Sequence, residues 1–237
     1  MIGIVGSDTK KLKDIENVFL ELGCESRVVE FPYELDRVDK IVLAGSGNFD
    51  DAMQNLRRGK WDQKIENAVE KGKPLLGICL GMQLLFETGD EKGAREGLGF
   101  FPGKALPVFE PLPEREKTPE AGWEPLKVRR ESPLFSGLPD QRVYFGKPYK
   151  VETEPEFVTA SMAFCGIDLT AAVEYDNVYA VQFLPEKSGA AGREILKNFA
   201  LLESRRSLAA YSPVIESSRE YEGDTYAELS LPSFPRH

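Results

Sequence analysis

The chain has 237 residues, of which 41% are hydrophobic, and this is enough to bury one sizeable domain with a short appendage. Its 39 acidic residues outnumber 30 basic ones, and the formal net charge of −9 repels nucleic-acid phosphate, so no nucleic-acid partner is predicted. Short basic runs such as residues 10–13 usually indicate a solvent-exposed face rather than a phosphate-binding site.

The N-terminal residues and the cysteines restrict the location of the protein. The chain opens on a short apolar run without a basic leader, and no run of about 18 apolar residues could span a membrane. The cysteines Cys24, Cys79 and Cys165 are odd in number and far apart, which argues against a disulfide framework and a zinc cage. We therefore predict a cytoplasmic protein without membrane contact, metal or cofactor.

The first half of the chain alternates between apolar runs and amphipathic stretches. A helix predicted at 10–22 ends at Gly23, as helices commonly do. The elements in order are strand 2–5, helix 10–22, strand 40–43 with a glycine turn at 44–47, helix 61–71 and strand 74–78. This alternation predicts a parallel sheet covered on both faces.

The second half differs in composition. Residues 101–133 are rich in proline and charge and predict loops with short edge strands. Strands of an antiparallel extension are predicted at 143–145, 157–160 and 170–173, followed by strand 178–183 and helix 192–202. The sequence thus predicts a three-layer α/β fold, with a mostly parallel sheet flanked by helices and an antiparallel extension. The domain spans residues 1–204, and 205–237 are predicted to be a weakly ordered tail.

Residues 74–83 carry the clearest chemical signal. They read Pro-Leu-Leu-Gly-Ile-Cys-Leu-Gly-Met-Gln, a buried strand that runs into the cysteine counterpart of the G-x-S-x-G nucleophile elbow. Gly77 and Gly81 permit the sharp turn, the helix N-terminus favours a thiolate at Cys79, and the N–H of Leu80 can donate to an oxyanion. The pattern alone leaves open a small buried cysteine that ends a strand, which is the role we expect for Cys24 and Cys165.

A longer segment, residues 74–87, resembles the nucleophile segment of class I glutamine amidotransferases, and more narrowly that of the glutaminase subunit of imidazole glycerol phosphate synthase. Four further motifs follow in that family's order: Gly97-Leu98-Gly99, Gly122-Trp123, Tyr144-Phe145 and Gln-Phe-Leu-Pro-Glu-Lys-Ser at 182–188. The resemblance covers roughly residues 1–202. It implies a class I glutaminase-like fold and hydrolysis of glutamine to glutamate and ammonia for histidine biosynthesis. It also implies a heterodimer with a barrel-type synthase (cyclase) partner.

The same resemblance assigns roles to individual residues. It makes Cys79 the nucleophile, gives Gln83 a contact to the substrate or oxyanion region, and makes Glu186 the triad member that orients the base. The stretch from Gly45 to Gly47 matches the oxyanion strand, although Ala44 stands where the family usually has proline.

Two further residues match family positions near the subunit contact. These are Trp123 and Lys187. For Trp123, ordinary packing stays an equally open alternative, because tryptophan is both a core and a hot-spot residue.

The base of the triad is missing. Leu184 stands where the family has histidine, and leucine neither accepts nor donates a proton. Gly146-Lys147-Pro148 replaces a His-Ser pair and Glu120 replaces another histidine, while the only histidine, His237, ends the predicted tail. General acid–base catalysis is worth about 10² to 10⁴ in rate, so a loss of at least that order is expected.

Three functions remain open from the sequence. The chain is either a glutaminase subunit with impaired activity or a catalytically deficient pseudo-glutaminase that binds or regulates a synthase. The third possibility is a different cysteine hydrolase with another base. Glu186 acting through a water and a folded-back His237 are the alternative bases weighed.

Overall fold

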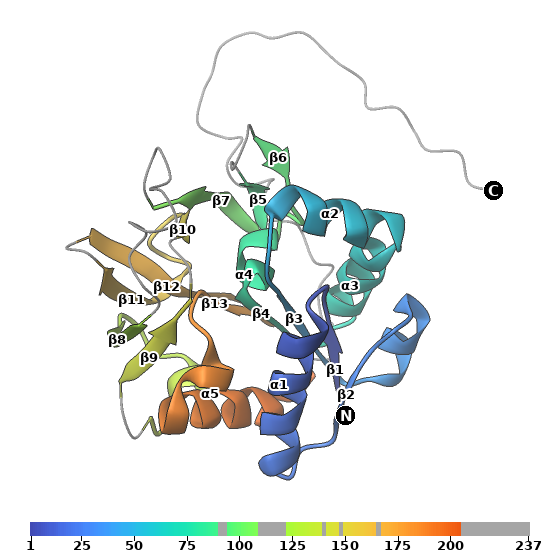
Figure 1. Ribbon diagram of the computed structural model, residues 1–237, viewed down its shortest axis with the longest axis horizontal. Helices are drawn as coiled ribbons and strands as arrows, with labels where there is room; N and C mark the ends of the chain where they lie inside the picture. Colours follow the sequence, from blue (N-terminus) through green and yellow to red (C-terminus); the bar gives the residue numbers. More distant parts are fainter. Residues whose placement is uncertain (90–93, 109–121, 139–140, 147–148, 165–166, 205–237) are drawn as a thin grey trace, which may run out of the picture.

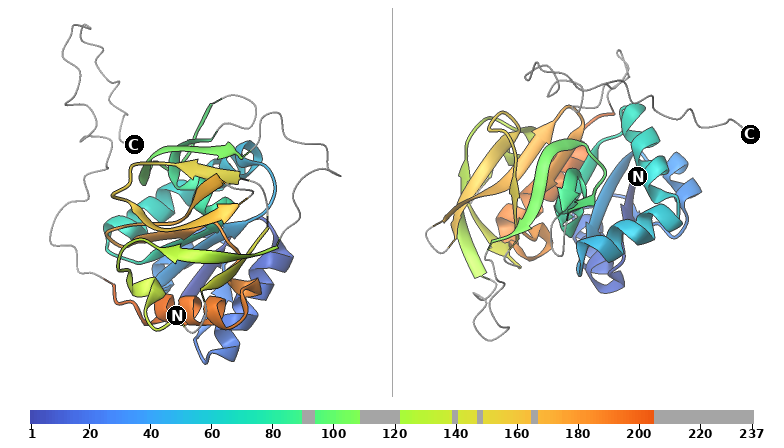
Figure 2. Two further views of the ribbon diagram at one scale, coloured as in Figure 1. Left: turned by 90° about the vertical axis from the view of Figure 1, so that its left-hand side faces the viewer. Right: turned by 90° about the horizontal axis from the view of Figure 1, so that it is seen from above.

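The computed structural model describes residues 1–89, 94–108, 122–138, 141–146, 149–164 and 167–204. Within these ranges the chain forms a nine-stranded sheet in the order β2-β1-β3-β4-β13-β12-β11-β8-β9 and a four-stranded sheet in the order β10-β7-β5-β6. Helices cover both faces of the first part of the large sheet (Figure 1, Figure 2). The predicted α/β fold class is therefore confirmed.

The first five strands of the large sheet run parallel. They are β1 (Ile2–Val5), β2 (Ser26–Val28), β3 (Lys40–Gly45), β4 (Leu75–Cys79) and β13 (Val178–Val181). Every residue of β1, β4 and β13 is buried, because helices cover both faces there. The continuous apolar runs seen in the sequence are thus the central strands of the sheet.

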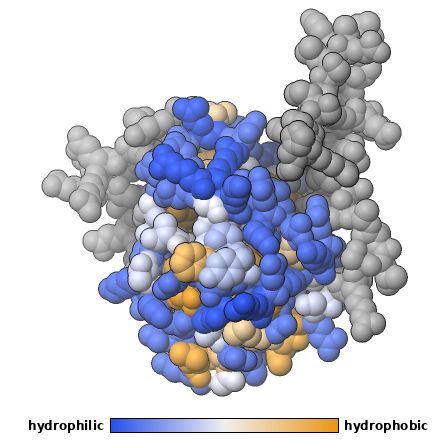
Figure 3. Space-filling view, turned by 90° about the vertical axis from the view of Figure 1, so that its right-hand side faces the viewer, coloured by the Kyte–Doolittle hydropathy of each residue, from blue (hydrophilic) through white to orange (hydrophobic). Residues whose placement is uncertain are grey.

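Two hydrophobic clusters hold the helices against the two faces of this parallel part. On one face α1 (Thr9–Glu21) and α5 (Gly189–Leu201) share a cluster, to which α1 contributes Leu12, Ile15 and Phe19. The other face carries η1 (Pro32–Arg37), α2 (Phe49–Arg58), α3 (Trp61–Glu70) and α4 (Leu80–Leu84). The face seen in Figure 3 is mostly hydrophilic, with small hydrophobic areas near its centre and along its lower part.

The remaining strands are the predicted antiparallel extension and a small side sheet. The extension contains β12 (Ile167–Tyr175), β11 (Val158–Phe164), β8 (Gly122–Val128) and β9 (Arg142–Phe145). The side sheet contains β5 (Phe86–Gly89), β6 (Arg95–Glu96), β7 (Phe101–Pro107) and β10 (Tyr149–Glu152). Two short helices, η2 (Pro133–Phe135) and η3 (Pro185–Lys187), lie in the connections.

The prediction of loops with short edge strands for residues 101–133 was wrong for β7 and β8. Each has seven residues and lies between two other strands. The reason that β8 accommodates Pro125 is that it changes partner there, since 122–125 pair with β9 and 126–128 with β11. Each part of β8 thus has one neighbour, and a proline is tolerated where only one side of a strand needs its N–H groups.

Helix α2 was also not predicted. Its start is marked by Asn48, whose side chain accepts from the N–H of Asp51, and its buried side is formed by Phe49, Ala52, Met53 and Leu56. The predicted tail at 205–237 and Cys165 lie outside the described residues. In the described ranges, no helix is both long and apolar enough to cross a membrane.

Gly81 in the first turn of α4 provides a test of the fold. A Cβ at this position would lie 1.9 Å from the backbone oxygen of Leu43, whereas a Cβ at Gly45 would have no neighbour closer than 3.5 Å. We expect Gly81→Ala to lower the free energy of unfolding by about 1–3 kcal/mol or more, because backbone must move. Gly45→Ala serves as the control and should cost clearly less. Equal urea midpoints for the two variants would contradict this packing.

Candidate active site at the end of strand β4

The turn from β4 into α4 places Cys79 in a strained conformation. Its backbone has φ 57° and ψ −111°, outside the regions that residues with a side chain ordinarily occupy. Close packing enforces the turn, since a Cβ at Gly77 would lie 2.9 Å from the backbone oxygen of Gly81. The predicted elbow is present, and Cys79 ends the strand directly before the N-terminus of α4.

A cavity of about 250 Å³ opens beside this turn at the carboxyl ends of the parallel strands. Cys79, Leu184 and Glu186 line it together with Lys11, Tyr144 and Gly146. The residues come from the ends of β4, β9 and β13 and from the first turn of α1. The fold therefore brings the predicted nucleophile, the predicted orienting carboxylate and Leu184, at the predicted position of the base, into one cavity.

Leu184 forms an apolar wall of the cavity. It is 8% exposed, and its Cδ1 packs so closely on Gly146 that a Cβ there would lie 2.8 Å away. Its backbone is fixed as well, because its N–H donates to the Tyr144 oxygen at 2.9 Å and its oxygen accepts from the Ser188 hydroxyl at 2.7 Å. Leu184 and Gly146, two positions where the sequence predicts departures from the family pattern, thus contact each other. Lys147, Pro148, Glu120 and His237 lie outside the described residues.

Glu186 is a buried carboxylate without a compensating donor. Neither carboxyl oxygen has a hydrogen-bond partner from another described residue. Burial raises the pKa of Glu186, and the positive charge of Lys11 opposes this only in part. Among the described residues, no imidazole lies beside this carboxylate.

The side chain of Gln83 is directed to Gln182. Its Nε2 donates to Oε1 of Gln182 at 3.2 Å, and Nε2 of Gln182 in turn lies 3.9 Å from Sγ of Cys79. Gln83 is buried and does not line the 250 Å³ cavity. Gln182 was not predicted to take part, although it opens the 182–188 motif.

The stretch that resembles an oxyanion strand is held by the start of α1. Nζ of Lys11 donates to the backbone oxygen of Gly45 at 3.0 Å, and the Ser46 hydroxyl donates to Asp8 at 2.5 Å. The Ser46 hydrogen bond and the N–H of Lys11 lower the pKa of Asp8. Lys11 is half-buried, which corrects the solvated position expected for it, whereas Lys10 and Lys13 are exposed as expected. The sequence signal for this contact was the position of Lys11 in the first turn of the helix that follows the buried strand β1.

The remaining predicted residues have different surroundings. Gly47 has φ +111°, a conformation that favours glycine, and it does not line the 250 Å³ cavity. Leu80 is the first residue of α4, and its side chain lines a different, larger cavity. Its backbone N–H remains at the elbow, as the sequence predicts.

Trp123 and Lys187 lie on the surface beside the active-site cavity. Trp123 is 45% exposed and makes an edge-on contact with Tyr144, with 6.1 Å between ring centroids. Nζ of Lys187 lies 5.9 Å from the centroid of the same Tyr144 ring. Tyr144 and Lys187 also line the cavity, so both predicted partner-contact residues lie against a ring at its rim.

Comparisons with known proteins agree with this geometry. The model of the family "Glutamine amidotransferase class-I" matches residues 8–202. The imidazole glycerol phosphate synthase subunit HisH of Desulfitobacterium hafniense is 40% identical over 200 residues, which cover 84% of this chain and 93% of that protein.

Two solved structures share the fold. A putative GMP synthase subunit protein from Thermoplasma acidophilum has a TM-score of 0.60 and 26% identity, covering 84% of this chain and 91% of that one. A crystal structure of a glutamine amidotransferase has a TM-score of 0.64 and 18% identity, covering 84% and 99%. With its cysteine elbow, its 182–188 turn and the extent of these matches, the chain belongs to the class I glutamine amidotransferase family.

Proposed function

We propose that this chain is the glutaminase-type subunit of a heterodimer with a barrel-type cyclase, and that its own hydrolysis of glutamine is strongly impaired. The identity of its HisH relatives supports the partner and the substrate. The observation that carries the impairment is Leu184 in the cavity of Cys79 and Glu186. Imidazole glycerol phosphate synthesis in the cytoplasm is the proposed setting, in line with the free thiols of Cys24 and Cys79.

The proposed chemistry needs two proton transfers. Sγ of Cys79 attacks the side-chain amide carbon of glutamine, and ammonia leaves from the resulting tetrahedral intermediate to give a thioester that water hydrolyses. The first transfer takes the proton from Sγ of Cys79, and Leu184 cannot accept it. In the second, ammonia must leave as a protonated amine, and Leu184 has no proton to give.

A second candidate function is that of a catalytically deficient binding or regulatory subunit. It is favoured by the contact between Leu184 and Gly146, since both substitutions remove polar groups from the same wall of the pocket. In that case free ammonia supplies nitrogen to the synthase, and the chain stabilises or regulates its partner.

A paired glutaminase assay distinguishes the two functions. We expect Leu184→His, with the cyclase subunit of an imidazole glycerol phosphate synthase present, to release glutamate about 10² to 10⁴ times faster than the native chain, because it restores the acid–base group. Cys79→Ala in both backgrounds is the control. A native rate that Cys79→Ala leaves unchanged contradicts the glutaminase function, and a variant without any gain favours the binding subunit.

Glu186 provides a test by pH. Burial raises the pKa of Glu186 in the folded protein above the ordinary value of 4.5. The stability that the neutral Glu186 side chain contributes is therefore fully present below pH 4.5, and it is lost as the pH rises through the folded pKa. We expect Glu186→Gln to raise the free energy of unfolding by about 1–3 kcal/mol at pH 8 and by little at pH 4. Urea unfolding at both pH values measures this, with the exposed Glu203→Gln as control. Equal effects at the two pH values would show that charge burial is not the cause.

The rim formed by Trp123, Tyr144 and Lys187 is the proposed contact with the cyclase. We expect Trp123→Ala to weaken binding of a cyclase subunit by about tenfold or more, as for a buried aromatic anchor. Leu201→Ala, 70% exposed on α5, is the control and should leave binding unchanged. Co-purification and titration calorimetry report the affinity. A chain that binds no cyclase at any accessible concentration argues against the heterodimer.

A further inference from the structure

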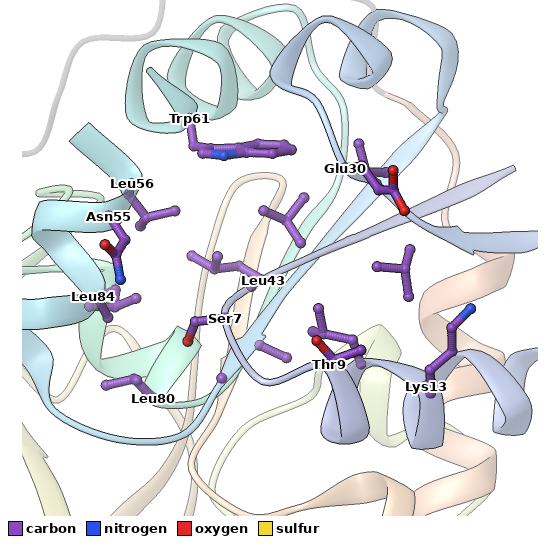
Figure 4. Close-up of a pocket in the computed structure, with 18 residues that line it drawn as sticks. Ser7, Thr9, Lys13, Glu30, Leu43, Asn55, Leu56, Trp61, Leu80 and Leu84 are labelled. Carbon is purple, nitrogen blue, oxygen red and sulfur yellow. The ribbon is translucent and has the colours of Figure 1, made fainter. Parts of the chain in front are cut away.

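A second and larger cavity, of about 540 Å³, lies at the carboxyl ends of β1, β2 and β3 (Figure 4). None of its lining residues lines the cavity of Cys79. Its volume is within the range of about 300 to 1,000 Å³ typical of small-molecule sites. An inference about this cavity therefore does not depend on the proposed glutaminase function.

The cavity lies at a topological switch point of the sheet. From β1 the chain leaves through α1 to β2 on one side, whereas from β3 it leaves through α2 and α3 to β4 on the other. The connecting helices cover opposite faces, so a crevice opens between the ends of β1 and β3. In open α/β sheets, ligands bind in this crevice.

The shape of the cavity suits a flat ring. Figure 4 shows the Trp61 indole edge-on, with a face directed into the cavity and Leu43 beneath it. Leu56, Leu80 and other aliphatic side chains form the walls. A planar ring entering this space would stack on the indole and bury its other face against methyl groups.

Polar groups stand on either side of this aromatic surface. In Figure 4 Asn55 and Glu30 lie on opposite sides of Trp61, and Ser7 lies below. Among the described residues, no hydrogen bond or ion pair engages the side chains of these three polar residues. Glu30 directly follows the strand β2 and Val29, which is the place where Rossmann-type domains carry the acidic residue that accepts from ribose hydroxyls.

The charges around the cavity disfavour an anionic ligand. Lys13 is a lining residue, but its Nζ is paired with Glu16 at 2.6 Å. The N-terminus of α1, where a phosphate would otherwise bind, is capped by the carboxylate of Asp8, which accepts from the N–H of Lys11 at 3.1 Å. The Glu30 carboxylate adds a further negative charge, so the cavity favours a neutral ligand that has hydroxyl donors.

We propose that this cavity binds a neutral purine nucleoside. The base stacks between Trp61 and Leu43, the Asn55 carboxamide pairs with the edge of the base, and the ribose hydroxyls donate to Glu30. An asparagine carboxamide matches the donor and acceptor pattern of an adenine edge, so adenosine is the probe of choice.

Calorimetric titration of the full chain with adenosine, 2′,3′-dideoxyadenosine and AMP tests the proposal. We expect saturable adenosine binding, and dideoxyadenosine and AMP about tenfold weaker or more. The affinity of dideoxyadenosine is lower because it lacks the hydroxyls that donate to Glu30, and that of AMP is lower because the Glu30 carboxylate repels its phosphate. AMP that binds tighter than adenosine would overturn the assignment of a neutral ligand.

Three variants locate the binding. Glu30→Ala should weaken adenosine about tenfold and make it equal to dideoxyadenosine, whereas Glu25→Ala, exposed and outside the cavity, should leave both affinities unchanged. Ala52→Leu, on the buried side of α2, narrows the cavity and should weaken adenosine binding about tenfold or more. The absence of a saturable signal at millimolar adenosine overturns the proposal. An affinity that neither Glu30→Ala nor Ala52→Leu changes does so as well.

Discussion

The close approach of α4 to strand β3 is the constraint on which both cavities depend. Gly81 allows the first turn of the helix to lie against the backbone of Leu43, and no larger residue fits there without moving the strand. This contact sets the strained backbone of Cys79 and fixes where the helix begins. As a result Cys79 faces one cavity while the next residue, Leu80, lines the other. The turn from β4 into α4 thus separates the two cavities.

The cavity of Cys79 combines a closely packed apolar wall with a buried carboxylate. Leu184 packs closely on Gly146, and the Ser188 hydroxyl donates to its backbone oxygen. The apolar wall is therefore closely packed. The unfavourable group in this cavity is Glu186, whose carboxylate is buried and accepts no hydrogen bond from another described residue. A structure that retains such a carboxylate keeps an electrostatic strain that a fully apolar pocket would not have.

The sequence predicted the parts of the structure that depend on local patterns. The apolar runs at 40–43 and 74–78 could be identified as central strands because burial on both faces removes polar residues from them. The elbow at Cys79 was equally predictable, since its glycines are required by backbone geometry. Proline and charge in residues 101–133 concealed β7 and β8, because a strand that changes partners tolerates residues that an ordinary central strand excludes.

Side-chain contacts between segments far apart in the sequence could not be predicted from local patterns. Nothing in the basic run at 10–13 indicates that Lys11 alone turns inward to the oxygen of Gly45. The contact of Leu184 with Gly146 and the link from Gln83 through Gln182 to Cys79 likewise arise only when the strands are side by side. The 540 Å³ cavity is a property of the strand order, which no single segment records.

The shared wall between the two cavities has a thermodynamic consequence. If a molecule in the larger cavity displaces Leu80, the peptide that joins Leu80 to Cys79 transmits the change to the thiol. Linkage then requires reciprocity: whatever factor that molecule applies to ligand affinity at Cys79, a ligand at Cys79 applies to it in return. In that case the elbow couples ligand binding in one cavity to ligand binding in the other. The coupling free energy then depends on how far the peptide unit between Cys79 and Leu80 can rotate.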